Sequence, residues 1–304
     1  MKSLVTTGNP GELALADRPE PAQPDDHALI EVRAAGVNRG ELALTTVLPA
    51  GSPLGWDVYG TVLRAAPDGT GPAEGTAVVG LADRDGWAER AVIPVDRLAA
   101  VPDPLGRSAA AIPVAGLTAL YAIRASGSLL GRTVLITGAG GGVGRFAVQL
   151  AAIAGARVLA STSSARRADG LTDLGAAEVL GYRNPPDEPI DVLLDGAGGE
   201  VLGTAYSRVA AGGSVICYGN TAREELRLPA DWGHARPGVT LHYLFLFREL
   251  AAQPVARDLA YLVGLAAGRE LDPQIATTVS WTEAGSALHA LHNRELNGKA
   301  LLTL

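Results

Sequence analysis

Three small residues, Ala139, Gly141 and Gly144, have the spacing of the glycine motif that holds the diphosphate of a dinucleotide. Small residues permit a tight turn, and the N–H groups at the start of the next helix meet the negative charge of a pyrophosphate. Because glycine accounts for 38 of the 304 residues, the spacing alone is a weak indication. It gains weight from its position between an apolar run over 133–137 and a helical apolar pattern that starts near Phe146. We therefore expect a dinucleotide site at this turn.

The residues after the next predicted strand, at 157–160, indicate which dinucleotide binds. A site for NAD usually has an Asp or Glu there, which accepts hydrogen bonds from the ribose 2′-hydroxyl. This chain has no acid at that place; hydroxyl residues are followed by Arg166 and Arg167. Guanidinium groups bind phosphate through charge-assisted hydrogen bonds, so we expect NADPH rather than NADH. In the alternative interpretation, both arginines lie on the solvated surface of the following helix.

Composition and charge exclude several classes of protein. The formal net charge of −7 argues against nucleic acid or an anionic membrane surface as a partner. There is no run of eighteen apolar residues and no apolar segment of a signal peptide at the start, so we expect a cytoplasmic protein. Cys217 is the only cysteine, which excludes an intrachain disulfide and a multi-cysteine zinc site. His289 and His292 are interpreted as helix surface or partner contacts, not as metal ligands.

The elements that position these residues fall into two kinds. Residues 1 to about 110 contain short strand-like runs separated by Gly, Pro and Asp, which is typical of a small β-rich domain. From the glycine motif onward, strands and helices alternate, which predicts an α/β fold with a doubly wound (Rossmann) parallel sheet. The expected strands there lie at 133–137, 157–160, 178–181, 192–195, 214–218 and 239–247, and the expected helices run from Arg167 to about Gly175, over 201–210 and over 248–268.

Six short segments along the chain form a specific pattern. They are AGVN at 35–38, GWDVYGTV at 55–62, GWAE at 86–89, AIPVAGLTA at 111–119, TGAGGGVG at 137–144 and GKALL at 298–302. In these segments the chain resembles the zinc-independent quinone oxidoreductase branch of the medium-chain dehydrogenase/reductase superfamily. The resemblance implies a GroES-like domain from 1–111 and 269–304, a nucleotide-binding domain at 112–268, and an active site in the cleft between them.

The resemblance also bears on metal binding. Zinc-dependent members have a cysteine early in the first domain and a Gly-His-Glu segment that together hold the catalytic metal. Here Asn38 stands in the cysteine segment and Trp56 replaces the histidine. Without a thiolate or an imidazole to activate an alkoxide, we expect no metal-assisted chemistry.

The family's cofactor contacts transfer to residues of this chain only as implications of the resemblance. Thr118 would lie near the nicotinamide. Backbone N–H groups of the turn would bind the pyrophosphate, and the side chains beyond the second strand would surround the 2′-phosphate. The implied cofactor-binding residues are Thr118, Gly141, Gly142, Val143, Ser163, Arg166, Arg167, Tyr182, Gly219, Asn220, Phe245 and Phe247.

Proteins of this branch share hydride delivery from NADPH to a quinone or to the β-carbon of an α,β-unsaturated carbonyl (an enone), with hydrogen bonds to the developing enolate oxygen. The candidate catalytic residues are Asn38, Tyr59 and Thr118, and Trp56 joins Asn38 and Tyr59 as a candidate substrate contact. Solvent is the alternative source of the proton. Two other functions stay open, namely an enoyl reductase that tailors a secondary metabolite and a non-catalytic NADP(H)-binding sensor.

We expect a homodimer that pairs through the apolar segment from Val239 to Phe247. This segment would form the last strand of the doubly wound sheet, and an unpaired edge is commonly paired or covered. In the alternative, the helical region at 248–268 covers the edge.

Overall fold

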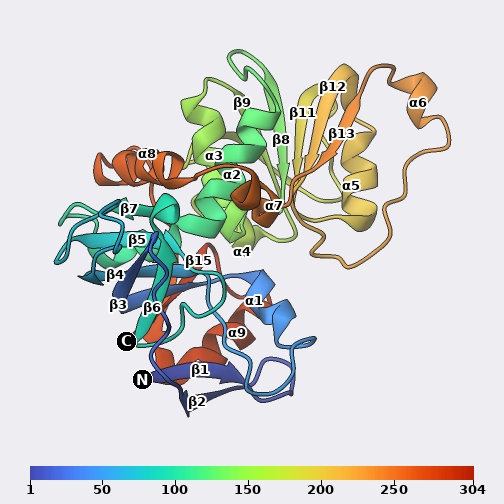
Figure 1. Ribbon diagram of the computed structural model, residues 1–304. Coiled ribbons are helices and arrows are strands. Elements are labelled where there is room, and N and C mark those ends of the chain that lie inside the picture. The colour runs from blue at the N-terminus through green and yellow to red at the C-terminus, as the bar shows by residue number, and fades with distance from the viewer. The chain divides into compact units, whose positions relative to one another are not determined.

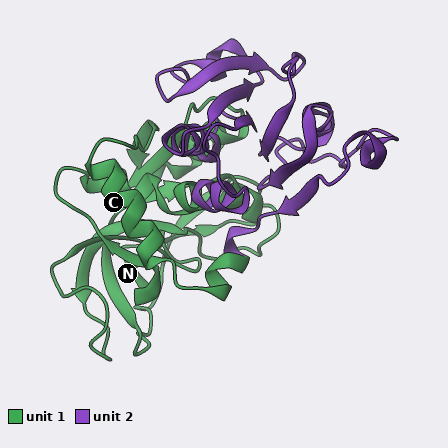
Figure 2. Ribbon diagram, turned by 90° about the horizontal axis from the view of Figure 1, so that it is seen from above, with its two compact units in different colours: residues 1–117, 248–304 green, residues 118–247 purple.

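The computed structural model describes all 304 residues, which divide into two compact units (Figure 2). Unit 1 comprises Met1–Leu117 and Arg248–Leu304, and unit 2 comprises Thr118–Phe247. This division differs from the expected boundaries near 111 and 269. Residues 248–268 belong to unit 1 because they pack on its elements; for example, the Val255 N–H donates to the carbonyl of Asp96 at 3.0 Å.

Unit 2 is built on a six-stranded parallel sheet with the order β10-β9-β8-β11-β12-β13 (Figure 1). Its strands are β8 (Thr133–Thr137), β9 (Arg157–Thr162), β10 (Ala176–Gly181), β11 (Ile190–Asp195), β12 (Val209–Cys217) and β13 (Thr240–Tyr243). Its helices are α3 (Gly142–Ile153), α4 (Ala165–Ala168), α5 (Gly199–Tyr206) and α6 (Trp232–Ala235). In chain order the strands run 3-2-1-4-5-6, so the direction of winding reverses between β8 and β11. This confirms the expected doubly wound fold.

The core of unit 2 explains why the apolar runs become strands. Leu135, Leu159, Leu193 and Val215, one from each of four neighbouring strands, share a buried cluster with Tyr206 of α5. A parallel sheet is covered on both faces, so its central strands are apolar throughout instead of alternating.

Three expected elements of unit 2 had wrong limits. The helix expected over 201–210 ends at Tyr206, because Val209 begins β12 and pairs with Ile190 of β11. The helix expected to reach Gly175 ends at Ala168, because Asp169 leaves the helical conformation with a ψ of 129° and Gly170 then adopts a left-handed φ of 73°. The strand expected at 239–247 stops at Tyr243, and α7 (Leu246–Ala252) begins three residues later. Leu246 and Leu250 are both buried and lie four residues apart, so this part of the apolar run follows the helical period.

Unit 1 contains a two-stranded antiparallel sheet, β1 (Lys2–Thr6) with β2 (Leu13–Asp17), and a larger sheet with the order β14-β15-β3-β4-β5-β7, in which β6 also pairs with β3. The larger sheet comprises β3 (His27–Val37), β4 (Asp57–Arg64), β5 (Ala77–Leu81), β6 (Arg90–Pro94), β7 (Leu98–Ala100), β14 (Ile275–Ser280) and β15 (Lys299–Thr303). The helices are α1 (Arg39–Leu44), α8 (Ala256–Ala267) and α9 (Ala284–His292), with short 3₁₀ turns at Val95–Arg97, Gly106–Ala111 and Trp281–Glu283. Helices α2 (Pro113–Ala125) and α7 each cross the boundary between the two units.

Strand β3 connects the two ends of the chain within unit 1. It pairs antiparallel with β4 on one side and with the C-terminal strand β15 on the other, where Val37 is opposite Ala300. Beside it, the fully buried Trp87 donates its indole N–H to the Gly36 carbonyl at 3.1 Å. The end of β3 is therefore fixed by residues from both ends of the sequence. No helix in either unit has the length and apolarity needed to span a bilayer.

Candidate active site

Residues 138–144, which we call the nucleotide turn, comprise the turn between β8 and α3 and the first three residues of α3 in unit 2. Gly138 has a φ of 66°, a conformation that glycine adopts without strain. A Cβ on Gly144 would lie 2.7 Å from the Cα of Ala139, so only glycine lets the first turn of α3 sit directly on the end of the strand. The motif residues are therefore small because backbone packs on backbone here.

The N–H groups of the nucleotide turn are of two kinds. The N–H of Gly141 donates to the Gly138 carbonyl at 2.9 Å, and the Gly141 carbonyl accepts the first helical bond, from Arg145. Gly142 and Val143 follow in the first turn of α3, where N–H groups have no carbonyl partner within the helix. Of the three donors expected from the sequence, Gly142 and Val143 are thus suited to a diphosphate, whereas Gly141 uses its hydrogen inside the turn.

Arg167 lies against the nucleotide turn. A Cβ on Gly140 would come within 3.1 Å of the Arg167 Cβ, and the position of a Cβ on Gly141 is 3.7 Å from a terminal guanidinium nitrogen of Arg167. The sequence separates these residues by more than twenty positions, but the parallel pairing of β8 and β9 brings the ends of both strands together. A positive charge therefore stands beside the donors of the turn, and the site fits a phosphorylated dinucleotide.

The other predicted phosphate contacts lie at the same sheet edge. Ser163 and Arg166 follow β9 and are exposed. Tyr182 follows the neighbouring strand β10, and its N–H donates to the Thr162 carbonyl at 3.1 Å. The structure thus brings the residues expected around the 2′-phosphate to the adjoining carboxyl ends of β9 and β10, where doubly wound sheets bind their ligands.

Gly219 and Asn220 follow β12, across the point where the winding reverses. The Asn220 amide donates to the Glu224 carbonyl at 2.8 Å, and a Cβ on Gly198 would lie 2.7 Å from the amide carbon of Asn220. Both predicted residues are therefore packed against the turn that follows β11. Phe245 lies between β13 and α7, and Phe247 is in the first turn of α7. Their rings are 5.7 Å apart, and Phe245 is more than half exposed.

Asp195, at the end of β11, is a site residue that sequence reasoning missed. It is fully buried; it accepts a short hydrogen bond from the Thr137 hydroxyl and one from the Gly198 N–H at 3.0 Å. The Thr137 hydroxyl in turn accepts the N–H groups of Gly196 and Ala197. Burial raises the pKa of the Asp195 carboxyl. These bonds join the carboxyl ends of β8 and β11. The signal that could have revealed them was an acid as the last residue of an apolar strand.

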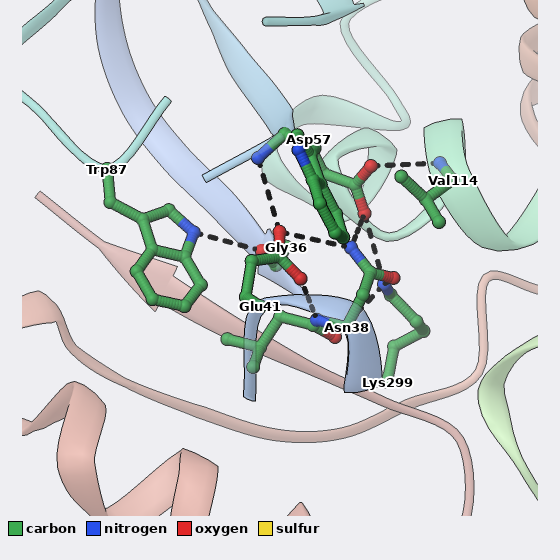
Figure 3. Close-up of polar contacts among 9 residues, drawn as sticks. Gly36, Asn38, Glu41, Asp57, Trp87, Val114 and Lys299 are labelled. Atoms are coloured by element: carbon green, nitrogen blue, oxygen red, sulfur yellow. Dashed lines mark hydrogen bonds and ion pairs between the residues drawn. The ribbon is translucent and has the colours of Figure 1, made fainter. Parts of the chain in front are cut away.

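Unit 1 contains a second set of functional groups, which we call the polar cluster, made of Asn38, Glu41, Asp57 and Lys299 (Figure 3). The Lys299 ammonium donates to the Val37 carbonyl at 3.1 Å, to Asp57 Oδ2 at 3.0 Å and, through a short bond, to Asn38 Oδ1. Asn38 Nδ2 donates to the same Asp57 oxygen at 2.9 Å. These hydrogen bonds are shielded from solvent, because the side chains of Lys299 and Asp57 are 2% and 0% exposed.

Glu41 occupies the first turn of α1 and closes the polar cluster on its other side. Its carboxyl accepts the N–H of Asn38 at 2.8 Å and the N–H of Trp56 at 3.2 Å, and the Asn38 amide lies at 3.5 Å. Burial, and next the charge of Asp57, raise the pKa of Glu41 to about 8. At neutral pH the polar cluster therefore holds one ammonium, one carboxylate and one neutral acid.

Two further features hold Asp57 in place. Its second oxygen accepts the N–H of Val114, in the first turn of α2, at 2.8 Å. On the facing strand, a Cβ on Gly36 would lie 2.8 Å from the Asp57 Cβ, so glycine leaves the space for the carboxylate. The two sequence motifs that contain Gly36 and Asp57 thus reflect one packing contact between neighbouring strands. Asp57, Glu41 and Lys299 were not among the functional residues expected from the sequence.

The other residues expected to contact substrate or cofactor, Trp56, Tyr59 and Thr118, differ in burial and in what they pack against. The Trp56 ring packs against Gly40, where a side chain would overlap it, and is 8% exposed. Tyr59 is on the same face of β4 as Asp57 but packs on an apolar cluster that includes Ala110, and its phenol does not join the polar cluster. Thr118 is a buried residue of α2, assigned to unit 2. Asn38 is the catalytic candidate whose side chain is bonded to the buried Lys299 and Asp57.

Comparison with known proteins places the chain in a family. A family model described as zinc-binding dehydrogenase matches residues 142–236, inside unit 2. The chloroplastic quinone-oxidoreductase homolog of Spinacia oleracea is 32% identical over 244 residues, which cover 71% of this chain and 74% of that protein. The chain belongs to the quinone oxidoreductase branch of the medium-chain dehydrogenases/reductases. The expected family and fold are thereby confirmed.

Other members of the family extend the comparison. The solved structure of the quinone oxidoreductase from Thermus thermophilus, described also in complex with NADPH, covers 100% of this chain and of that one, with 30% identity and a TM-score of 0.85. Erythronolide synthase EryA2 of Saccharopolyspora erythraea is 34% identical over 292 residues, or 90% of this chain. The matched segment spans 8% of the length of EryA2, so this chain corresponds to one part of that synthase.

The description of the family model raises the question of a zinc ion. Nowhere in the structure does a group of three His, Cys, Asp or Glu side chains lie together in a way that could hold a metal. Asn38 and Trp56 offer neither thiolate nor imidazole, and Asp57 is bonded to the Lys299 ammonium. The residues at this place in the quinone oxidoreductase fold therefore do not fit a zinc ion.

Proposed function

We propose that this protein is an NADPH-dependent reductase that transfers a hydride to a quinone or an α,β-unsaturated carbonyl compound without a metal ion. The observation that carries the proposal is the guanidinium of Arg167 beside Gly141 in the nucleotide turn. At this place it supplies a charge and paired donors for the 2′-phosphate, the group that distinguishes NADPH from NADH.

When bound, NADPH supplies the hydride and its two electrons. In the proposed complex, the N–H groups of Gly142 and Val143 donate to the pyrophosphate, and the missing side chain of Gly140 lets Arg167 lie against the turn. Ser163, Arg166, Arg167 and Tyr182 hold the 2′-phosphate. Thr118, Gly219, Asn220, Phe245 and Phe247 adjoin the ribose and the nicotinamide.

The acceptor needs a hydrogen-bond donor and a proton. Addition of a hydride to the β-carbon of an enone moves an electron pair onto the carbonyl oxygen, and a donor aimed at this oxygen stabilises the charge. Asn38 is the donor that we propose. An amide does not release its proton at neutral pH, so water supplies the proton of the α-carbon, and Tyr59 is the side-chain candidate to be compared with it.

Two variants test the cofactor assignment. Arg167→Ala removes the charged bond to the phosphate, worth about 1.5–3 kcal/mol, and is expected to weaken NADPH binding by about 10- to 150-fold while NADH binding changes little. Arg157→Ala is the control, because Arg157 is in the same unit and pairs with Glu178 and Glu188 at its surface. Unchanged NADPH affinity in Arg167→Ala would show the assignment to be wrong.

The acceptor class is tested by following NADPH oxidation with small quinones, simple enones and enoyl thioesters, each with and without a chelator. Turnover with quinones or enones that survives chelation supports the proposal. Loss of activity on chelation contradicts it. Tight NADPH binding without turnover on any acceptor would instead identify a non-catalytic NADPH-binding protein.

A second function is favoured by one specific observation, the 34% identity to a segment of erythronolide synthase EryA2. A reductase acting in such biosynthesis would tailor a secondary metabolite by reducing an enoyl thioester. If the protein is an enoyl thioester reductase, enoyl thioesters in the acceptor panel should turn over faster than quinones. If it is a quinone or enone reductase, quinones should turn over faster than enoyl thioesters or at a comparable rate.

A further inference from the structure

The chain contains only two lysines, and they lie in opposite environments. Lys2 is half exposed and pairs with Asp17 at the surface of unit 1. Lys299 is 2% exposed and donates to three oxygens, those of Val37, Asn38 and Asp57. An ammonium has three hydrogens, so all of them are used and Lys299 has none left for a ligand.

These bonds determine which way the Asn38 amide faces. An ammonium has no acceptor, so the atom of Asn38 that meets Lys299 must be the oxygen. An ionised carboxylate has no donor, so the atom that meets Asp57 must be the nitrogen. The opposite orientation would place an NH₂ group against the ammonium and an oxygen against the carboxylate. The chemistry of the two neighbours therefore allows one orientation only.

The same bonds direct the second amide hydrogen. One hydrogen of Asn38 Nδ2 is directed at Asp57 at 2.9 Å, whereas the contact of Nδ2 with Glu41 is at the long limit of 3.5 Å. Asn38 is also the most exposed of the four residues in the polar cluster, at 9%. The hydrogen of Asn38 that is directed at Glu41 is thus the most weakly bonded donor of the cluster, and it belongs to the most exposed of the four residues.

We propose that Lys299 and Asp57 are positioning residues that fix the Asn38 amide with its N–H toward the substrate carbonyl oxygen. This inference rests on the proposed function, in which that oxygen gains charge as the hydride is added. The bond from Lys299 to Asn38 Oδ1 also polarises the amide and strengthens the opposite N–H as a donor. Lys299 touches neither substrate nor cofactor in this scheme and acts through Asn38.

Lys299→Met is the first test, with Lys2→Met as the matched control. Without Lys299 the Asn38 oxygen loses its ammonium donor and the amide is held at its nitrogen by Asp57, so its position is less fixed, and misplacement of such a donor costs about 10- to 100-fold in kcat. KM is expected to change by less than about threefold, because the donor matters most when the oxygen is charged. Lys2→Met should leave both constants unchanged. An unchanged kcat in Lys299→Met would overturn the inference.

Removal of one partner leaves a buried charge unpaired, which can destabilise the fold. The double variant Lys299→Met with Asp57→Asn removes the pair together and keeps the polar cluster uncharged, and it is expected to show the same loss in kcat. If this variant unfolds at the same temperature as the parent and keeps full kcat, the positioning role is excluded.

A double-mutant cycle separates positioning from general structural support. In an Asn38→Ala background, Lys299→Met should lower kcat by less than about twofold, because the residue through which Lys299 acts is already absent. A further loss as large as that in the parent would mean that Lys299 acts by another route and would overturn the inference.

A spectroscopic measurement tests the geometry without turnover. With ¹⁵N-labelled lysine, the protein has two ammonium resonances, and the Lys2→Met variant assigns them. Asn38→Ala should shift the Lys299 signal and leave that of Lys2 in place. An unmoved Lys299 signal would contradict the bond to Asn38 whatever the enzyme does. Conversely, if Asn38→Ala shifts the Lys299 signal but the wild-type protein shows no turnover, the result would count against the proposed function and not against the geometry.

Discussion

Opposing physical effects determine the pKa of the buried Glu41 carboxyl. Two backbone N–H groups donate to its carboxyl, which favours the ionised form, but burial and the nearby charge of Asp57 favour the neutral form. The balance raises its pKa to about 8, from an ordinary value of 4.5. With Glu41 neutral, the charges of Lys299 and Asp57 cancel, and the buried cluster carries no net charge at neutral pH.

This shift predicts a pH dependence of stability. Between pH 4.5 and about 8 the unfolded chain has released the Glu41 proton while the folded protein retains it, so the contribution of Glu41 to the free energy of unfolding falls as the pH rises. The fall approaches about 1.4 kcal/mol per pH unit within this window and ends above the folded pKa. Urea unfolding at pH 5 and pH 8 measures it.

Glu41→Gln removes the titrating group and should make the difference between pH 5 and pH 8 smaller than in the parent. Glu31→Gln is the control, since Glu31 is an exposed residue of the same unit that pairs with Arg33. If the parent and Glu41→Gln lose the same free energy across this range, Glu41 is ionised in the folded protein and the interpretation of the cluster fails.

At the scale of the element, the contact between β8 and α3 decides whether the nucleotide turn forms. Gly144→Ala would place a Cβ 2.7 Å from the Ala139 Cα, and neither backbone can yield without moving the helix. Such overpacking typically costs about 1–3 kcal/mol. We expect a lower free energy of unfolding and weaker NADPH binding, measured by chemical denaturation and by titration calorimetry.

Gly264→Ala is the matched glycine substitution. Gly264 is inside α8 and has open space around the position of a Cβ, so alanine should stabilise the helix by about 0.5–1 kcal/mol. Equal effects of the two substitutions would show that close packing does not explain the glycine at position 144.

Strand β13 is the element on which we base the proposed homodimer. It is at the edge of the sheet, and each of its four residues is exposed. Leu241, Tyr243 and the adjoining Phe245 present large apolar side chains there, and an exposed apolar edge is typically paired with another strand.

We predict that Leu241→Arg shifts the protein from dimer to monomer in sedimentation velocity experiments, because a charge would be buried at the strand pair. Tyr261→Arg is the control, since Tyr261 is about equally exposed but lies on α8. A wild-type protein that is monomeric at high concentration, or a Leu241→Arg variant that stays dimeric, would argue against pairing through β13.

At the scale of the whole molecule, the sequence predicted those features that depend on local pattern. The apolar run at Thr133–Thr137, the small residues after it and the regular alternation beyond were enough to predict the doubly wound sheet and the turn that α3 follows. The limits of α4 and β13 were wrong, because a left-handed glycine and a change from strand to helix within one apolar run are set by tertiary contacts.

The polar cluster was beyond sequence reasoning for a different reason. Its members come from residues 38, 41, 57 and 299, and only the pairing of β15 with β3 brings the last of these to the first. A lysine near the end of a chain has no pattern that distinguishes a buried ammonium from an exposed one. Asp195 could likewise be recognised as an acid at the end of a strand, but its bond to Thr137 exists only in the folded sheet.

The central claim is that unit 2 binds a phosphorylated nicotinamide dinucleotide at the nucleotide turn. Titration calorimetry of the purified protein with NADPH and with NADH tests this claim most directly. We predict saturable binding of NADPH that is at least about tenfold tighter than that of NADH, as expected for one charged bond to the 2′-phosphate. Equal affinity for both dinucleotides, or no heat with either, would contradict the account.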